Sequence, residues 1–507
     1  MSNDVVVKME GITKTFGPVV ANDNVFLEVC RGEVHSILGE NGAGKSSLMN
    51  VLSGVYKPEK GSIQIKGENV RFNSPKDAIQ VGIGMIYQHF KLVNAMSAKE
   101  NIIAGQNGSL YIDPKKASQE IRDISEKYGL EIEPDKLIRH MSVAEKQRVE
   151  ILKVIYRGAD ILILDEPTAV LTPQETSKLF DIIRKMQSAG CAVIIITHKL
   201  HEVMEISDRI SVLRKGKYIT TVPNVNTNPR ELTDLMVGKS VSLSIERAES
   251  DKHEGLLNVN NLTTVNIERV KTLKEISFQL YGGEILGVAG VANSGQKELC
   301  EAIAGLEKVK SGDIVFKGES IVGFNPRDII DKGISLSFVP EDRLGMGLVS
   351  TMDITNNILL KEYRKQKGFF ITRKNSRKMA SYLIDKLNID TPGTEHPVRL
   401  LSGGNIQKVL LGREIENNPQ LIISAYPSRG LDIGSAHLVY DLLNDQKQKG
   451  VGVIYVGEDL DVLLELCDRI MVLCAGEITG IVDASKATKE ELGFMMSGKK
   501  LEEVSNA

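Results

Sequence analysis

Residues 39–46 read Gly-Glu-Asn-Gly-Ala-Gly-Lys-Ser and match the pattern G-x-x-x-x-G-K-S at every fixed position. The glycines of such a segment let the backbone curl so that several N–H groups point inward at phosphate oxygens. The lysine would reach the β- and γ-phosphates of a nucleotide, and the serine hydroxyl would bind Mg2+. The predicted phosphate-binding residues are Gly39, Glu40, Asn41, Gly42, Ala43, Gly44, Lys45, Ser46 and Ser47.

Two carboxylates stand at the end of an apolar run. Residues 161–164 read Ile-Leu-Ile-Leu, and Asp165 and Glu166 follow them directly. A buried strand that ends in this pair is typical of a Walker B segment. Asp165 would hold Mg2+, directly or through a water molecule, and Glu166 would polarise the water that attacks the γ-phosphate. Together with the phosphate loop, this pair predicts nucleotide hydrolysis.

We expect the phosphate-binding segment and the carboxylate pair each to follow a strand and to precede a helix. Short apolar runs at residues 161–164 and 192–196 suit buried parallel strands, and amphipathic stretches such as residues 174–186 alternate with them. This alternation predicts an α/β fold with a parallel sheet. The longest apolar runs are far shorter than the roughly 20 residues needed to cross a bilayer, so we expect no membrane span in this chain.

The chain matches itself at a long period. Residues 61–68 (GSIQIKGE) match residues 312–319 (GDIVFKGE) at an offset of 251, and residues 208–213 (DRISVL) match residues 468–473 (DRIMVL) at an offset of 260. A period of this length indicates duplicated domains and not a solenoid. We expect the duplication to place one copy of the machinery in each half.

Length and composition agree with two domains. A chain of 507 residues exceeds one ordinary core, and we expect domains over 1–240 and 256–507 with a charged linker over 241–255. A net charge of -3, with no basic half, favours no nucleic-acid partner. Five scattered cysteines without metal spacing, and a start that lacks a secretory signal, favour a reducing cytoplasm.

The order of these motifs resembles that of the ATP-binding-cassette (ABC) family over essentially the whole chain. Residues 401–405 (LSGGN) look like the signature loop of that family. In the family, one nucleotide is clamped between the phosphate loop of one cassette and the signature of another. The resemblance implies two tandem P-loop domains, each with a RecA-like parallel-sheet core, a helical subdomain and an antiparallel β subdomain, and it implies ATP and Mg2+ as cofactors.

Three further residues receive roles from this resemblance. Phe16 looks like the aromatic residue that stacks on adenine. Gln88 resembles the Q-loop glutamine, which senses the γ-phosphate, contributes to the Mg2+ site and signals to a membrane partner. His198, after the apolar run 192–196, resembles the switch histidine that contacts the γ-phosphate.

The first half departs from the family at its signature, where residues 141–145 read MSVAE and not LSGGQ. A signature brings helix N-terminal N–H groups and a serine hydroxyl close to the opposing γ-phosphate. The Cβ atoms of Val143 and Ala144 should hinder that approach. The second half keeps the signature residues Ser402, Gly403, Gly404 and Asn405.

The second half departs from the family where ATP is handled. Gln296 stands at the position of the lysine, and Lys297 stands at that of the Mg2+-binding serine. Lys297 cannot replace the lost lysine, because one residue along a helix turns a side chain by about 100°. The offset of 260 places Ala425, Tyr426 and Glu458 at the positions of Asp165, Glu166 and His198.

Two interpretations explain this asymmetry. The second half is either a decayed copy kept for folding, or the partner of the first half in one competent composite site and one impaired site. We favour the second interpretation, because decay should not spare the one loop that serves the opposite site. The competent site would contain Lys45, Ser46, Gln88, Asp165, Glu166 and His198, facing Ser402 and Gly404.

Further details narrow the family. Fused cassettes with residues 295–296 (GQ), 340–343 (PEDR) and 427–434 (PSRGLDIG) resemble bacterial importers of simple sugars and nucleosides, and Ala425 and residues 457–461 (GEDLD) favour the nucleoside branch. The resemblance implies two integral-membrane permease subunits, an extracytoplasmic solute-binding protein and a place on the cytoplasmic face of the cell membrane. It also implies that the chain binds neither the cargo nor nucleic acid.

Three alternatives stay open at this point. The importer could belong to the ribose or galactose branch. The chain could instead be a soluble tandem ABC ATPase acting on ribosomes or DNA, although such proteins usually keep both sites intact and carry a long charged linker. It could also be a regulatory nucleotide-binding module without turnover, which the complete set at Lys45, Asp165, Glu166 and His198 opposes.

Overall fold

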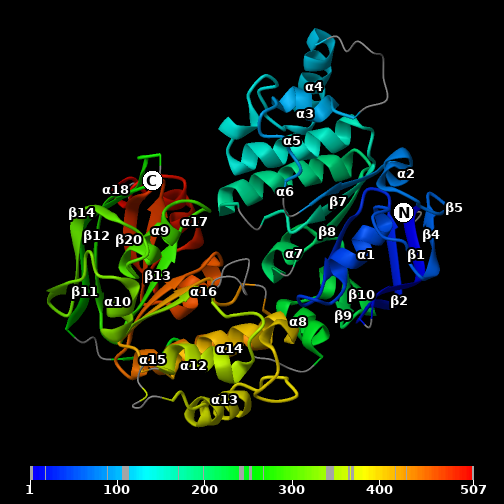
Figure 1. The fold of residues 1–507 in the computed structure, drawn as a ribbon. Coiled ribbons are helices and arrows are strands. Elements are labelled where there is room, and N and C mark those ends of the chain that lie inside the picture. Colours follow the sequence, from blue (N-terminus) through cyan, green and yellow to red (C-terminus); the bar gives the residue numbers. More distant parts are fainter. Residues whose placement is uncertain are drawn as a thin grey trace. The chain divides into compact units, whose positions relative to one another are not determined.

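The computed structural model divides the chain into two compact units, residues 1–243 and 244–507 (Figure 1). The predicted residues Gln88 and His198 lie outside the residues that the structure describes. The described residues are 4–17, 19–87, 90–105, 114–168, 171–197, 199–238, 245–250, 254–266, 268–338, 347–363, 366, 370–416, 418–429 and 431–504.

The first unit contains a six-stranded and a four-stranded sheet. The large sheet has the order β10-β9-β3-β8-β7-β6, and its neighbours are parallel except for β10 and β9. The small sheet is antiparallel, in the order β2-β1-β4-β5. The strands are β1 (Val5–Phe16), β2 (Val19–Cys30), β3 (Val34–Leu38), β4 (Lys60–Ile65), β5 (Glu68–Val70), β6 (Ile83–Ile86), β7 (Ile161–Asp165), β8 (Ala192–Ile196), β9 (Arg209–Arg214) and β10 (Lys217–Pro223).

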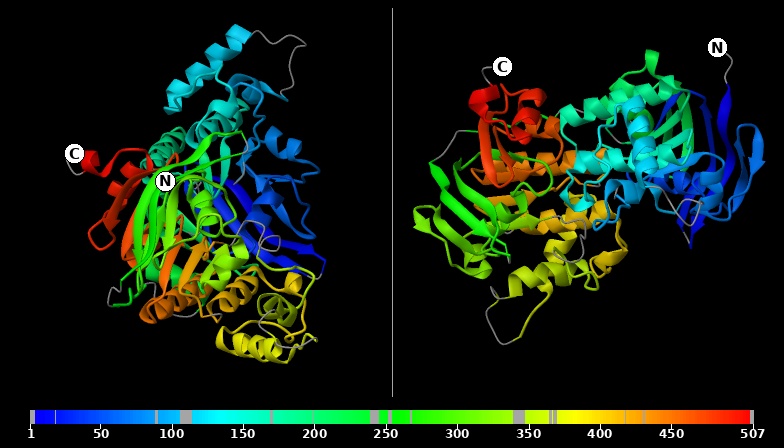
Figure 2. Two further views of the ribbon diagram at one scale, coloured as in Figure 1. Left: turned by 60° about the vertical axis from the view of Figure 1, so that its left-hand side comes forward. Right: turned by 90° about the horizontal axis from the view of Figure 1, so that it is seen from above.

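Some helices of the first unit cover the large sheet, and others form a helical part of their own. The helices α3, α4 and α5 gather at the end of the unit away from the four-stranded sheet, as two further views also show (Figures 1 and 2). The helices are α1 (Lys45–Leu52), α2 (Pro75–Gln80), α3 (Ala98–Ile103), α4 (Pro114–Tyr128), α5 (Val143–Tyr156), α6 (Pro173–Ser188), α7 (Leu200–Ile206) and α8 (Pro229–Val237), with short 3-10 turns η1 (Ile138–His140) and η2 (Asn224–Asn226).

The second unit repeats this architecture, with a four-stranded sheet β12-β11-β14-β15 and a six-stranded sheet β16-β17-β18-β13-β19-β20. Its strands are β11 (Gly255–Val265), β12 (Lys271–Tyr281), β13 (Ile285–Ala289), β14 (Val309–Phe316), β15 (Glu319–Ser320), β16 (Ile334–Phe338), β17 (Leu421–Ala425), β18 (Gly452–Val456), β19 (Arg469–Cys474) and β20 (Glu477–Asp483). Its helices are α9 (Gln296–Ile303), α10 (Pro326–Asp331), α12 (Ile354–Glu362), α13 (Lys374–Lys386), η4 (Val398–Leu400), α14 (Gly403–Ile415), α15 (Ile433–Gln448), α16 (Leu460–Leu466), α17 (Lys489–Met496) and α18 (Leu501–Val504).

The strand registers of the two units agree with the sequence offsets. Val34 of β3 pairs with Val193 of β8, and Ile285 of β13 pairs with Val453 of β18. These partners are related by the same shifts of 251 and 260 residues that the sequence matches give. The predicted α/β fold with two tandem cassettes is confirmed.

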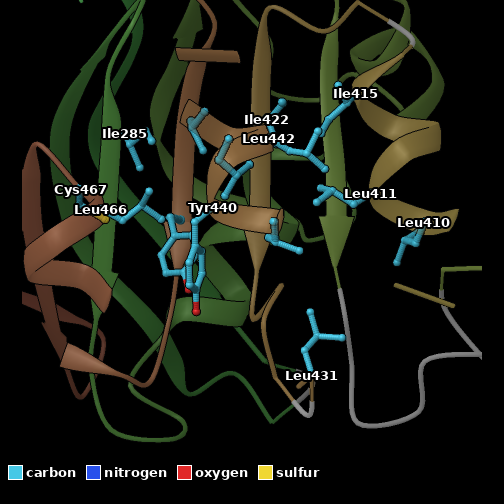
Figure 3. Close-up of a cluster of buried hydrophobic side chains, with 14 of the residues drawn as sticks. Ile285, Leu410, Leu411, Ile415, Ile422, Leu431, Tyr440, Leu442, Leu466 and Cys467 are labelled. Carbon is cyan, nitrogen blue, oxygen red and sulfur yellow. The ribbon is translucent and has the colours of Figure 1, made fainter. Parts of the chain in front are cut away.

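Two hydrophobic clusters cover the two faces of each large sheet. Along β7, Ile161 and Ile163 belong to one cluster, and Leu162 and Leu164 belong to the other. This alternation follows from the two-residue period of a strand and explains why the strand is apolar throughout. Figure 3 shows the cluster of the second unit that corresponds to the one containing Leu162 and Leu164. There the strand residue Ile422 lies among helix residues such as Leu442.

The first residues of the second unit are hydrogen-bonded to its helix α15. The N–H of Ala248 donates to Asn444 Oδ1 (3.2 Å), and the Asn444 amide donates back to the carbonyl of Glu246 (2.9 Å). Part of the charged stretch predicted as a linker is therefore held against α15. No helix among the described residues combines the length and the hydropathy that a bilayer crossing requires.

Candidate functional site

The phosphate-binding segment lies between β3 and α1 of the first unit. A Cβ atom on Gly39 would lie 2.3 Å from the carbonyl oxygen of Leu213, and one on Gly44 would lie 2.3 Å from that of Ala21. Gly44 also has a φ of 95°, in the left-handed region that glycine tolerates best. The close packing of strands β9 and β2 around the loop therefore explains both fixed glycines.

Lys45 is the first residue of α1, and its side chain folds back over the loop. Its Nζ donates to the carbonyl oxygens of Gly39 (2.6 Å) and Glu40 (3.0 Å). Burial lowers the pKa of Lys45, and the negative charges of Glu166, Asp165 and Glu40 oppose this shift. The loop thus holds a buried cation whose present partners are neutral carbonyls and nearby carboxylates, an arrangement that suits an incoming anion.

Asp165 and Ser46 meet beside this lysine. Burial and the charge of Glu166 raise the pKa of Asp165 to about 6, while a hydrogen bond from Ser46 and the charge of Lys45 act in the other direction. A carboxylate and a hydroxyl in contact are hard oxygen donors of the kind that Mg2+ accepts along with phosphate oxygens. The residues at this position therefore fit the predicted Mg2+ site.

Glu166 follows β7 in an unusual backbone conformation. Its φ is 47°, and its N–H donates to the carbonyl of Ile196 at the end of β8 (2.9 Å). A left-handed conformation is uncommon outside glycine, so the hydrogen bond to β8 helps to fix this turn. The structure thus brings Lys45, Ser46, Asp165 and Glu166 into one region of the first unit.

Phe16 ends β1 with 42% of its surface exposed. Tyr56 meets its ring edge-on at a centroid distance of 5.1 Å, and Lys14 Nζ lies 5.3 Å from the ring centroid. An exposed ring that is held by its neighbours agrees with the predicted stacking role. That role stays a prediction, as do the roles of Gln88 and His198.

The N-terminus of α5, at the first signature position, is closed by its own side chains. Ser142 Oγ accepts from the N–H of Glu145 (3.2 Å), and Glu145 Oε2 accepts from the N–H of Ser142 (2.7 Å). Glu145 Oε1 also pairs with Lys136 (2.6 Å). Burial works against ionisation, but the bonds from Lys136 and Ser142 lower the pKa of Glu145 overall, which keeps a negative charge at this helix end.

The N-terminus of α14, at the second signature position, is different. Ser402 Oγ accepts from the N–H of Asn405 (3.4 Å), whereas the side chain of Asn405 turns aside and exchanges two 3.3 Å hydrogen bonds with the backbone of Asp390. The first turn of α14 contains no acidic residue. A Cβ atom on Gly404 would meet its nearest neighbours at 3.6 Å, an ordinary contact, so packing within the unit does not require this glycine.

The second phosphate loop keeps the shape of the first and fills it with its own side chain. Gln296 is 3% exposed, donates to the carbonyl of Val291 (3.1 Å) and accepts from the N–H of Ser294 (3.1 Å). The side chain of Lys297 is 57% exposed and pairs with Glu301 at 3.7 Å. Lys297 therefore points to solvent and supplies no charge to the loop.

The second Walker B position has lost its carboxylates but not its backbone. Ala425 is buried in the core, and Tyr426 has a φ of 53° and donates its N–H to Val456 (2.8 Å), as Glu166 does to Ile196. Burial raises the pKa of Tyr426 to about 12. The oxygen donors that fit Mg2+ in the first unit have no counterpart at these positions.

Two supporting residues were missed by the sequence analysis. Asn22, fully buried on β2, donates to the carbonyl of Gly44 (3.0 Å), and Glu202, buried on α7, bonds to Thr168, two residues after Glu166. Asn22 is followed by two further polar residues, Asp23 and Asn24, so nothing in the strand pattern distinguished it from them. Nothing in the sequence distinguished Glu202 from an ordinary exposed acidic residue of a short helix.

Comparison with known proteins agrees with this geometry. A family model described as "ABC transporter" matches residues 22–169 and 273–424. The nucleoside import ATP-binding protein of Lactococcus lactis subsp. cremoris is 43% identical over 99% of this chain and 100% of its own length, and the guanosine import ATP-binding protein of Bacillus subtilis is 44% identical over 99% of each chain. A ribose import ATP-binding protein of Rubrobacter xylanophilus is 37% identical over 98% of this chain and 99% of its own. The chain therefore belongs to the ABC transporter family, with two ATP-binding cassettes in one polypeptide.

Proposed function

We propose that this chain is the ATP-hydrolysing subunit of an importer and that hydrolysis takes place at the first cassette. The observation that carries the proposal is the cluster of Lys45, Ser46, Asp165 and Glu166, set against its loss in a second cassette of the same fold. A protein that needed two equal sites would keep both clusters. Full-length similarity to import ATP-binding proteins supports the coupling to transport.

The residues of the first cassette divide the chemistry. Lys45 and the loop N–H groups bind the β- and γ-phosphates, and Phe16 stacks on adenine. Ser46 and Asp165 hold Mg2+ together with Gln88, and the ion neutralises charge that develops on the phosphates. Glu166 polarises the attacking water, and His198 contacts the γ-phosphate.

We propose that the signature of the second cassette completes this site when ATP is bound. An open helix N-terminus with Ser402 and Gly404 can donate hydrogen bonds to a γ-phosphate and favours negative charge. The N-terminus of α5 carries the carboxylate of Glu145, which would repel the same group. This difference supports one competent and one impaired composite site.

Nucleosides are the proposed cargo. Two relatives above 40% identity are named as import proteins for a nucleoside and for guanosine, while the ribose import protein described above is 37% identical. A ribose or galactose importer is the second candidate. The cargo would pass through two integral-membrane permease subunits after delivery by an extracytoplasmic solute-binding protein, with this chain on the cytoplasmic face of the cell membrane and bound to no nucleic acid.

ATPase assays on the transporter reconstituted in proteoliposomes, with its solute-binding protein, test this function. Guanosine or uridine should stimulate phosphate release several-fold, ribose and galactose should not, and the Lys45→Ala variant should remain at background. Stimulation by the sugars alone would move the chain to the sugar branch. Co-sedimentation with ribosomes, without association with permeases, would favour the soluble alternative.

A further inference from the structure

The short helix α7 buries a carboxylate beside the catalytic segments of the first cassette. Glu202 is 3% exposed, and among the residues that the structure describes it contacts three. One of these follows the Walker B segment, and the other two are the sequence neighbours of His198. The contacts are to Thr168, Thr197 and Lys199.

The first contact reaches the segment that contains Glu166. Thr168 lies two residues after Glu166, is buried, and donates its hydroxyl to Glu202 Oε2 (2.7 Å). Lys199 Nζ reinforces the link, since it donates to the carbonyl oxygen (3.2 Å) and hydroxyl oxygen (3.3 Å) of Thr168. The segment after β7 is therefore held by a carboxylate and an ammonium group at once.

The remaining contacts reach the segment around residue 198. Lys199 Nζ pairs with Glu202 Oε1 (3.1 Å), and Thr197 Oγ1 lies 3.5 Å from Glu202 Oε2. The backbone N–H of Lys199 donates to Thr197 Oγ1 (3.1 Å). Both neighbours of His198 thus belong to the network that holds Thr168.

The second cassette has the same helix without this network. At the offset of 260, Val462 of α16 replaces Glu202, and Ser428, Gly457 and Asp459 replace the three partners. Ser428 bonds instead to the hydroxyl of Tyr455 (3.3 Å). The fold therefore accepts an apolar residue at this position of the helix.

A buried carboxylate is costly unless it is fully bonded, and replacing such a group by an apolar residue is often neutral or stabilising. Stability of the fold is thus a weak reason for Glu202. We propose that Glu202 is a positioning residue, which ties the segment of Glu166 to both neighbours of His198 and fixes the separation of these two catalytic groups. The inference rests on the proposed ATPase function.

The first test compares Glu202→Val, which installs the residue of the second cassette, with wild type in the full chain. The kcat for ATP hydrolysis should fall at least about tenfold while KM and the affinity for ATP change less than about twofold, because positioning acts on the transition state. Glu202→Gln, which keeps an acceptor for Thr168, should retain more activity than Glu202→Val. The matched control Ser428→Ala should leave kcat unchanged.

A double-mutant cycle separates positioning from general destabilisation. Adding Glu202→Val to His198→Ala should lower kcat by less than about twofold, because one of the two groups whose separation Glu202 fixes is already absent. Multiplied losses would overturn the inference, and so would a raised KM at unchanged kcat. If Glu202→Val does not fold, Thr168→Val and Glu202→Gln carry the same cycle. An inactive wild-type chain would instead refute the proposed function, whereas an active Glu202→Val variant would refute only this inference.

Discussion

The two phosphate loops of this chain have one shape and two chemistries. Gly44 and Gly295 precede their helices with φ values of 95° and 109°, and the next residue in each, Lys45 or Gln296, donates to carbonyls of its own loop. Only the first loop has a positive charge to offer, and the second lends one of its N–H groups to the amide of Gln296. Glycines and packing thus set the shape of the loop, whereas its side chains decide whether it can bind phosphate.

The two signature helices show the reverse distribution. The capping box of Ser142 and Glu145 satisfies the N-terminus of α5 internally, and the simple cap of Ser402 leaves more of the N-terminus of α14 for an outside anion. Each cassette has therefore lost what the other retains. Four predictions test this distribution.

The largest effect is expected from Glu166→Gln. Loss of the group that we propose to polarise the attacking water should reduce kcat about 1,000-fold while ATP still binds, so the variant should accumulate the ATP-bound form. Single-turnover phosphate release and retention of labelled ATP measure the two properties. The equivalent change in the second cassette, Tyr426→Phe, should alter kcat less than about twofold. A similar loss in both variants would end the distinction between the two cassettes.

The second prediction concerns the loops themselves. Lys45→Ala removes the charge that we propose to bind the β- and γ-phosphates and should lower kcat/KM about 100-fold. Gln296→Ala removes a side chain that, among the described residues, bonds to its own loop, and it should change kcat/KM less than about twofold. Steady-state ATPase measurements on the two variants decide the matter, and equal losses would show that the second loop also serves hydrolysis.

The third prediction is a pH dependence. In the folded chain without Mg2+ or nucleotide, the pKa of Asp165 is about 6, above its ordinary value of 3.8. Ionisation is therefore unfavourable in the folded state, and stability falls as the pH rises from about 4 through 6. Asp165→Asn should be more stable than wild type by about 3 kcal/mol at pH 7.5, with the difference vanishing below pH 4. Urea unfolding in chelator measures this, and a constant difference across pH would contradict it.

The fourth prediction compares the two cap serines. Ser402→Ala should lower kcat about tenfold, and Ser142→Ala should lower it less than about twofold, because only Ser402 faces the γ-phosphate in the composite site that we propose. Both changes remove a helix cap worth about 1 kcal/mol, so thermal unfolding should shift similarly in the two variants. This equal shift is the internal control for folding. Equal losses of activity would mean that the two signatures work alike.

Much of this could be predicted from the sequence, because the informative features are local. The pattern at residues 39–46 and the offsets of 251 and 260 are contained in short segments, and they led to the α/β fold and the two cassettes. The structure brings Lys45, Ser46 and Asp165 together as the motifs predicted. The predicted contact with the second signature, and the places of Gln88 and His198, remain predictions.

The rest depends on contacts between distant residues. The bond from Asn22 to Gly44 spans 22 positions, and the bond from Thr168 to Glu202 spans 34. No local pattern distinguishes Glu202 from a solvated helix residue, and only its burial reveals it. Similarly, the sequence shows that a glutamine replaces the lysine at position 296, but not that this amide occupies the loop.

The left-handed turn at Tyr426 has a consequence for the history of the chain. A bulky residue at a φ of 53° is strained by about 1 kcal/mol or more. A tyrosine at this position also lacks the carboxylate that could polarise an attacking water. The turn is the one that Glu166 uses, so we infer that the duplication preceded the loss of the carboxylate. The phosphate loop and the Walker B position of the second cassette thus keep the backbone of a hydrolytic site, and restoring hydrolysis there would require new side chains but no redesign of the backbone.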